Sequence, residues 1–180
     1  MKSPVVFALA LVAIALSNLM LHADEPTTDR EKVVALVKKL GGSVEIDEKA
    51  KEKPVVAVHL SDTRVTDADL ELLKSHTKLH RLYLQNAAIT DEGLAHLKDQ
   101  TELHTLSLNH TKVTDAGLEN LKGLTKLKSL SLANTRITNK GLEQLKGLTK
   151  LQTLHLKGSL VSDAGAKDLM TALPKLEIDR

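Results

Sequence analysis

The strongest constraint on this chain is an internal repeat of 24 residues that begins at Pro54 and continues to near the end. Each unit has the pattern L-x-x-L-x-L, followed five residues later by another aliphatic residue. The first aliphatic position of the five units is occupied by Val55, Leu79, Leu103, Leu127 and Leu151. A unit this short cannot bury its leucines alone, so the sequence predicts an array in which each unit packs against its neighbours.

Each unit is expected to fold as a strand, a turn and a helix. In the L-x-L segment the leucines point to one side of a short strand and the x residues to the other. A pair such as Thr114-Asp115 follows, with a hydroxyl that caps a helix and an acid in the first turn. Leucines three residues apart, such as Leu118 and Leu121, then bury one helix face. The five capping positions are Thr66, Thr90, Thr114, Thr138 and Ser162.

Two further columns, meaning equivalent positions in successive units, carry structural expectations. A glycine column follows the caps, and we expect its missing side chains to let neighbouring helices approach closely. Its members are Gly93, Gly117, Gly141 and Gly165, with Asp69 in the first unit. A hydroxyl column in the turns is expected to hydrogen-bond the backbone, except at Ala87. Its members are Thr63, Thr111, Thr135 and Ser159.

Both ends of the array carry segments that we interpret as caps. Thr28 and Glu31 form a capping box. An apolar stripe with helical spacing follows, and it ends at Gly41-Gly42. The stripe consists of Val33, Leu36, Val37 and Leu40. Residues 44–47 alternate as a half-buried strand. At the other end, the leucine pattern restarts two residues early at Leu173, Leu176 and Ile178 and predicts a closing strand.

Residues 1–23 have the features of a signal peptide. Lys2 precedes an apolar run from Val5 to Leu16, which is short for a bilayer span. An uncleaved signal anchor is the alternative, and membrane contact is expected only in that case. Either way we expect an exported protein, in the periplasm, the cell envelope or the medium. The organisation is a signal peptide at 1–23, a helix-strand cap at 24–53 and the repeat array at 54–180.

The units at 103–125 and 127–149 carry the motifs Thr-Asp/Asn-x-Gly-Leu and Lys-Gly-Leu-Thr. With these motifs the chain resembles the 24-residue repeats of exported bacterial leucine-rich-repeat proteins, which are similar in design to the ribonuclease-inhibitor type. The fold expected is a right-handed α/β leucine-rich-repeat solenoid, with a short parallel sheet on its concave face and helices on its convex face. The resemblance implies an interaction role and no particular ligand.

Composition excludes several functional classes. The chain has no cysteine, which excludes disulfide scaffolds, thiolate metal sites and cysteine nucleophiles. Lys and Arg number 25 against 23 Asp and Glu, a balance that argues against a nucleic-acid partner. With Phe7 in the predicted signal peptide, Tyr83 is the one aromatic residue of the mature chain, too few for base stacking.

The outward strand positions form the candidate binding face. Arg81 and Tyr83 lie on one strand, and these two residue types are favoured at interface hot spots. Histidines and an amide surround them. The candidate protein-binding residues are His59, His80, Arg81, Tyr83, His104 and Asn109.

His80 and His104 are neighbours on adjacent strands, and His110 lies on the same unit as His104. Three imidazoles can hold a transition metal, although no Asp, Glu or Cys completes the ligand set nearby in the ladder. The alternative is that they are polar residues of a solvated sheet. We predict no resident metal and no cofactor, and keep His-based metal binding as a weaker alternative.

No enzymatic activity is expected. Ser107 and Ser131 face outward beside His104, but a face of small polar residues lacks the pocket, orienting group and oxyanion hole of a hydrolase. The lysine column of the helices is interspersed with Glu and is expected to be a solvated surface. The predicted function is therefore a non-catalytic binding module for an unidentified protein or peptide. A structural or self-associating envelope protein is the alternative.

Overall fold

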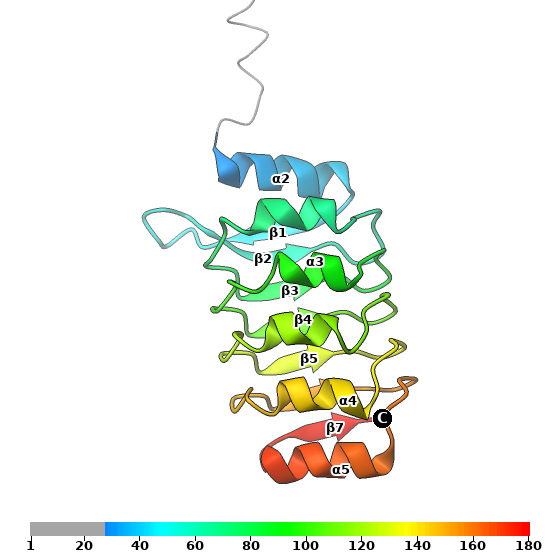
Figure 1. Cartoon of the computed structure of the whole chain (residues 1–180). Helices are drawn as coiled ribbons and strands as arrows, with labels where there is room; N and C mark the ends of the chain where they lie inside the picture. Colours follow the sequence, from blue (N-terminus) through cyan, green and yellow to red (C-terminus); the bar gives the residue numbers. More distant parts are fainter. Residues whose placement is uncertain (1–27) are drawn as a thin grey trace, which may run out of the picture.

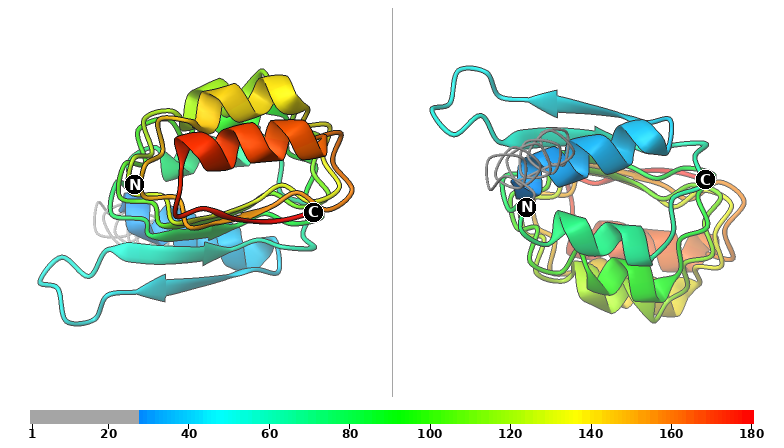
Figure 2. Two further views of the ribbon diagram at one scale, coloured as in Figure 1. Left: turned by 90° about the horizontal axis from the view of Figure 1, so that it is seen from below. Right: turned by 90° about the horizontal axis from the view of Figure 1, so that it is seen from above.

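A computed structural model describes residues 28–180, and the predicted signal peptide lies outside this range. The described chain is an elongated solenoid with strands along one side and helical segments along the other (Figure 1, Figure 2). Its strands form one sheet and lie side by side in chain order. They are β1 (Ser43–Ile46), β2 (Val55–His59), β3 (Arg81–Tyr83), β4 (Thr105–Ser107), β5 (Ser129–Ser131), β6 (Thr153–His155) and β7 (Glu177–Asp179).

Strands β2 to β7 are parallel, and each residue of β3 to β5 pairs with the equivalent residue of the next unit. Leu82 pairs with Leu106, and Leu106 with Leu130. All three side chains are fully buried, because alternate residues of a strand point to opposite sides of the sheet. The repeat pattern therefore builds one continuous leucine core along the array, as the sequence predicts.

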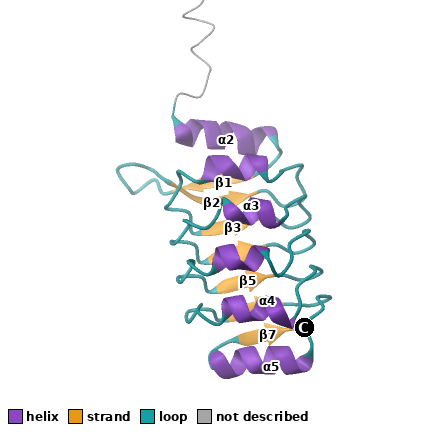
Figure 3. Ribbon diagram, viewed as in Figure 1, coloured by secondary structure: helices purple, strands orange, loops and turns teal. Residues whose placement is uncertain are grey.

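Each unit has the helical segment that the sequence predicts (Figure 3). In the first and third units this segment is a 3₁₀ helix. Each segment must fit between one strand and the return to the next, and 3₁₀ geometry is common in such short pieces. The segments are α2 (Asp29–Lys39), η1 (Ala68–Leu73), α3 (Asp91–Ala95), η2 (Gly117–Leu121), α4 (Asn139–Leu142), η3 (Glu143–Leu145) and α5 (Asp163–Ala172).

The predicted hydroxyl caps are present where α-helices form. Thr90, Thr138 and Ser162 precede α3, α4 and α5, and each side-chain oxygen accepts a hydrogen bond from a backbone N–H of the first turn. The prediction is wrong at Thr66 in the first unit. There the hydroxyl donates to Asp69 Oδ2 at 2.8 Å, and η1 has no side-chain cap.

The Asp of each Thr-Asp pair reaches the next unit. Asp67 accepts hydrogen bonds from the backbone N–H of Thr90 at 2.9 Å and from its hydroxyl at 2.6 Å. The same two bonds join Asp91 to Thr114 and Asp115 to Thr138. Asn139 Oδ1 likewise accepts from the backbone N–H of Ser162 at 2.9 Å, but its Nδ2 donates to the Ser162 hydroxyl at 2.9 Å. We call these contacts the Asp–Thr ladder, and it links successive units where their helical segments begin.

The glycine column lets neighbouring helical segments approach closely, as expected, and the group for which it makes room is the side chain of the ladder. A Cβ atom on Gly93 would lie 2.2 Å from Asp67 Oδ1, so the closest neighbour is the carboxylate of the preceding unit. The first repeat has no such carboxylate before it, and Asp69 stands at its glycine position. Asp69 Oδ2 accepts from the backbone N–H of Thr66 at 2.9 Å and takes the place of the missing acid. The same crowding is found at Gly117, Gly141 and Gly165.

Each strand from β2 to β6 leads into a turn that contains a left-handed residue. Asp and Asn tolerate this conformation better than most residues, and glycine adopts it freely. His110 occupies this position in the third unit with φ of 56°. The turn residues are Asp62, Asn86, His110, Asn134 and Gly158.

The turn hydroxyls bond the backbone as predicted. Thr111 Oγ1 donates to the carbonyl of Leu108 at 2.7 Å, and equivalent bonds are made by Thr63 and Thr135. Ala87 has no hydroxyl, and its turn keeps a backbone bond to Leu84 at 3.2 Å.

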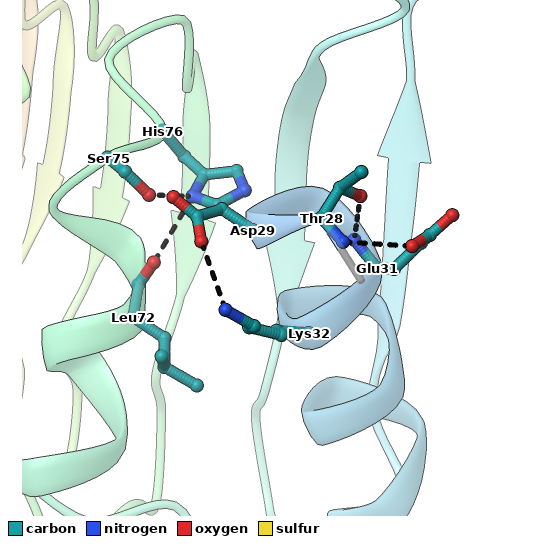
Figure 4. Close-up of polar contacts among 7 residues, drawn as sticks. All are labelled: Thr28, Asp29, Glu31, Lys32, Leu72, Ser75 and His76. Carbon is teal, nitrogen blue, oxygen red and sulfur yellow. Dashed lines mark hydrogen bonds and ion pairs between the residues drawn. The ribbon is translucent and has the colours of Figure 1, made fainter. Parts of the chain in front are cut away.

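The N-terminal cap consists of α2 and β1, and β1 pairs antiparallel with β2. The predicted capping box is present: Glu31 N–H donates to Thr28 Oγ1 at 3.2 Å, and Thr28 N–H donates to Glu31 Oε2 at 3.0 Å (Figure 4). The figure also shows His76 of the first unit facing Asp29 of α2. At the other end β7 closes the sheet, as predicted. Within residues 28–180 no helix is long and apolar enough to cross a bilayer.

Candidate binding face

Two rows of outward-facing side chains cross the sheet from β1 to β7. The tyrosine row is Ser43, His59, Tyr83, Ser107, Ser131, His155 and Asp179. The arginine row is Glu45, Ala57, Arg81, Thr105, Ser129, Thr153 and Glu177. Large side chains gather on β1 to β3, whereas β4 and β5 contribute small hydroxyl residues. Larger side chains return on β6 and β7, where His155 Nδ1 lies 3.2 Å from Asp179 Oδ2. Four of the six predicted binding residues lie on or beside β2 and β3.

Glu45 of the cap strand holds two of the predicted binding residues. Its Oε2 accepts a hydrogen bond from Arg81 Nη2 at 2.6 Å, and its Oε1 lies 3.0 Å from His59 Nε2. The three side chains are between 39% and 48% exposed, so the ion pairs contribute little to stability. Their effect is to fix the positions of Arg81 and His59 on the face.

The rings of His59 and Tyr83 stack on one another. Their centroids are 4.7 Å apart and their planes differ by 16°. An open hollow of about 540 Å³ lies beside this stack, and both rings line it. Its other lining residues are Gly41, Gly42, Ser43, Ser61 and Gln85. We call this feature the tyrosine hollow. Two predicted binding residues thus share one concave feature of the surface.

His80 and His104 meet edge to face, with ring centroids 5.3 Å apart. His104 Nδ1 is buried and has no hydrogen-bond partner among the described residues. His110 does not join them, because it occupies a left-handed turn and its Nε2 lies 3.2 Å from Asn134 Nδ2. In the described part of the chain, no group of three or more His, Asp or Glu side chains is close enough to hold a metal ion.

The Asn109 side chain is hydrogen-bonded to the backbone of the next unit. Its Oδ1 accepts a hydrogen bond from the N–H of Ala133 at 2.9 Å. Asn109 therefore lies on the predicted face but bonds another repeat through its acceptor. Ser107 is also bonded to a neighbouring unit, because its hydroxyl donates to Gln85 Oε1 at 3.2 Å. An amide oxygen does not act as a general base, so this bond does not activate Ser107 as a nucleophile.

Lys74, Lys122 and Lys146 of the lysine column are each paired with a carboxylate, in line with the interspersed signs of the sequence. Lys74 and Lys122 each contact a glutamate three residues earlier, at 3.3 and 3.2 Å. Lys146 contacts both Glu143 and Asp168, and hydrogen bonds to these two carboxylates raise the pKa of Lys146. This side of the solenoid is a solvated surface of alternating signs.

Another ion pair, between Lys126 and Glu102, lies where the strands begin. Lys126 donates to both oxygens of Glu102, at 2.6 and 2.7 Å. This hydrogen bonding lowers the pKa of the Glu102 carboxyl. The contact joins two units at equivalent positions, so it adds to the links between repeats.

Two stretches of the sequence match family models. Residues 101–161 match a model described as "Leucine rich repeat", and residues 75–97 match another described as "Leucine Rich repeat". The chain therefore contains leucine-rich repeats, and its fold is a leucine-rich-repeat solenoid. Among curated proteins, none matches this chain in sequence.

Solved structures with the same fold include bacterial and plant proteins. An internalin (inlF) from Listeria monocytogenes is 27% identical, with a TM-score of 0.60 over 69% of this chain and 34% of that one. Internalin C2 (inlC2) from the same species is 25% identical, with a TM-score of 0.50 over 68% of this chain and 59% of that one. The chain thus spans about a third and three fifths of these internalins.

A plant protein shows the same fold at lower identity. The leucine-rich-repeat ectodomain of the receptor kinase SOBIR1 from Arabidopsis thaliana is 15% identical, with a TM-score of 0.56 over 86% of this chain and 92% of that one. Leucine-rich-repeat proteins generally act as protein-interaction modules and are typically non-enzymatic, which supports a binding role for this chain.

Proposed function

We propose that this chain is a non-catalytic, exported bacterial binding module that holds a protein or peptide on its sheet face. The design proposed is that of 24-residue leucine-rich repeats similar to the ribonuclease-inhibitor type. The signal-peptide features of residues 1–23 support export. The binding surface proposed is the part of the face over β1 to β3, centred on Tyr83.

One observation carries the location: Glu45 fixes Arg81 and His59 at 2.6 and 3.0 Å, and His59 stacks on Tyr83. Side chains that are already ordered lose less entropy when a partner binds. Tyr and Arg are also the residue types that most often dominate interface energies. The helical side offers mainly Lys and Glu, which are depleted at interface cores.

The alternative is a structural or self-associating envelope protein. The two sheet edges of the described chain do not favour sheet-to-sheet association. Edge strand β7 is short and carries Glu177 and Asp179, and edge strand β1 has an irregular register next to Glu45. Short, charged and irregular edge strands oppose pairing between molecules.

The test is a peptide selection on the purified protein, using a random peptide library displayed on phage. Selected peptides are then synthesised and measured against Tyr83→Ala and the matched control Lys122→Ala on the helical side. We expect Tyr83→Ala to weaken binding by more than about fivefold, which corresponds to about 1 kcal/mol, with little change in melting temperature. Lys122→Ala should change neither the binding affinity nor the melting temperature. Binding that depends on Lys122 and not on Tyr83 would overturn the assignment of the face.

A further inference from the structure

The tyrosine hollow combines aromatic surface with unpaired polar groups. The rings of His59 and Tyr83 supply the aromatic part. The hydroxyls of Ser43 and Ser61 have no hydrogen-bond partner among residues 28–180. Gln85 accepts from Ser107 through Oε1, which leaves its amide NH₂ available. The hollow therefore offers donors and acceptors beside a flat apolar surface.

No Lys, Arg, Asp or Glu side chain lines this hollow. On the face, Glu45 and Arg81 are paired with each other at 2.6 Å, and Asp62, which follows Ser61, accepts a hydrogen bond from Asn86 Nδ2 at 2.7 Å. Nε2 of His59 faces Glu45 Oε1 at 3.0 Å. A charged group that entered the hollow would lose hydration without gaining an opposite charge.

A neighbouring hollow shows the contrast. It measures about 270 Å³, lies where β2 and β3 begin, and is lined by Asp47, Lys51, Glu52 and Lys78 among others. That hollow has charges of both signs. The uncharged lining of the tyrosine hollow is thus a local property of one place on the face, where the strands end.

We infer that the tyrosine hollow takes one uncharged side chain of the partner peptide, with a planar end that forms hydrogen bonds: tyrosine, asparagine or glutamine. This inference rests on the proposed function and names the chemistry that the site selects. A planar group stacks beside the His59 and Tyr83 rings. Its hydroxyl or amide then bonds Ser43, Ser61 or Gln85. The volume of about 540 Å³ holds such a side chain with its backbone, since it lies within the range of ligand pockets.

The experiment uses the same displayed library on the full chain, followed by affinity measurements on the selected peptides. Ser61→Gln fills the hollow from its wall without adding charge. Ser131→Gln is the matched control, because Ser131 lies in the tyrosine row on β5 and outside the hollow. We expect Ser61→Gln to weaken binding about tenfold or more, whereas Ser131→Gln changes it less than about twofold. In the peptide, replacing the selected Tyr, Asn or Gln by Asp should cause a similar loss.

The outcomes separate this inference from the proposed function. Peptides whose binding depends on Tyr83 but is unchanged by Ser61→Gln would overturn the inference about the hollow. The proposal that the sheet face binds the partner would still stand. Peptides that share an acidic or basic residue whose replacement abolishes binding would overturn the uncharged class. A wild-type protein that selects no peptide, or binds only neutral oligosaccharides, would overturn the proposed function itself and with it this inference.

Discussion

Asp91 and Thr114 stand 23 residues apart in the sequence and are joined by two hydrogen bonds. The backbone N–H of Thr114 donates to Asp91 Oδ1 at 2.8 Å, and its hydroxyl donates to Oδ2 at 2.6 Å. A charged acceptor makes such bonds stronger than neutral ones. One carboxylate thus satisfies a half-buried backbone group of the next unit and fixes the distance between the two units.

The first prediction is that Asp91→Ala lowers the free energy of unfolding by about 1–3 kcal/mol, because it leaves a half-buried N–H of Thr114 without a partner. Denaturant titration followed by circular dichroism measures the loss. Asp163→Ala is the matched control, since Asp163 has the same place in the first turn of α5 but is almost fully exposed and contacts Arg180. Its loss should stay below about 1 kcal/mol. Equal losses would contradict a ladder that stabilises the array.

The second prediction concerns Gly117, which faces the same carboxylate. A Cβ atom there would lie 2.3 Å from Asp91 Oδ1, so Gly117→Ala must displace that group and weaken its bonds. We expect a loss of about 1 kcal/mol or more. Gly147→Ala is the control, because nothing lies within 4 Å of the added Cβ and φ is not positive there. That substitution should be neutral or stabilising.

A double-mutant cycle identifies the cause of the Gly117 effect. In an Asp91→Ala background the closest remaining neighbour of the new Cβ is Leu94 Cδ1 at 3.1 Å, the end of a flexible side chain. Gly117→Ala should therefore cost much less in that background than alone, and the two changes should not be additive. Additive losses would show that the glycine serves some other contact.

The sequence predicts the array well because its strongest signal, the leucine period, is also the physical cause of the fold. Leu82, Leu106 and Leu130 pair in register as the period requires. The Thr-Asp motif is harder to interpret, because one unit alone suggests a cap and a favourable charge. Its second role appears only when the Asp of one unit meets the Thr of the next. The 3₁₀ helices η1 and η2 follow from spatial limits that no single residue encodes.

The candidate face is predicted less completely. Arg81, Tyr83 and His59 lie together as expected, because the repeat sets their register. The contacts of Glu45 with Arg81 and His59 are not predicted, because Glu45 lies on a strand outside the repeats that runs antiparallel to β2. The alternation of residues 44–47 shows that Glu45 faces outward, but not which strand lies beside it. His110 is missed as a left-handed turn residue, although Asn86 and Asn134 share its column and histidine is enriched in that conformation.

The third prediction is that Gln100→Leu stabilises the protein by about 1 kcal/mol. Gln100 is fully buried, and its Oε1 has no hydrogen-bond partner among the described residues. Its Nε2 donates to the carbonyl of Leu73, which also accepts from the N–H of His76. That carbonyl therefore stays bonded after the change. The later units hold Leu124 and Leu148 in this column, both fully buried. A measured loss of stability would show that the amide bond outweighs its unpaired oxygen.

The fourth prediction concerns His76, which stands in the same column as Gln100 and contacts the N-terminal cap. Its Nδ1 lies 3.1 Å from both the Leu72 carbonyl and the Ser75 hydroxyl. Burial lowers the pKa of His76 below its ordinary value, and this outweighs the opposing effects of the Leu72 carbonyl and Asp29. The neutral imidazole is thus the form that fits between η1 and α2.

This pKa shift makes stability depend on pH in one direction. Above about pH 6.5 the ring is neutral in both the folded and the unfolded chain, and the contribution is fully present. As the pH falls below that value, the unfolded chain binds the proton first, so the free energy of unfolding decreases until the folded pKa is passed. His76→Leu should therefore flatten the decline between pH 7 and about pH 5. Gln100→Leu is the control, because it changes the same column without a titrating group and should shift the curve without altering its slope. If the free energy of unfolding changed with pH equally in wild type and His76→Leu, protonation of His76 would not contribute to the pH dependence of stability.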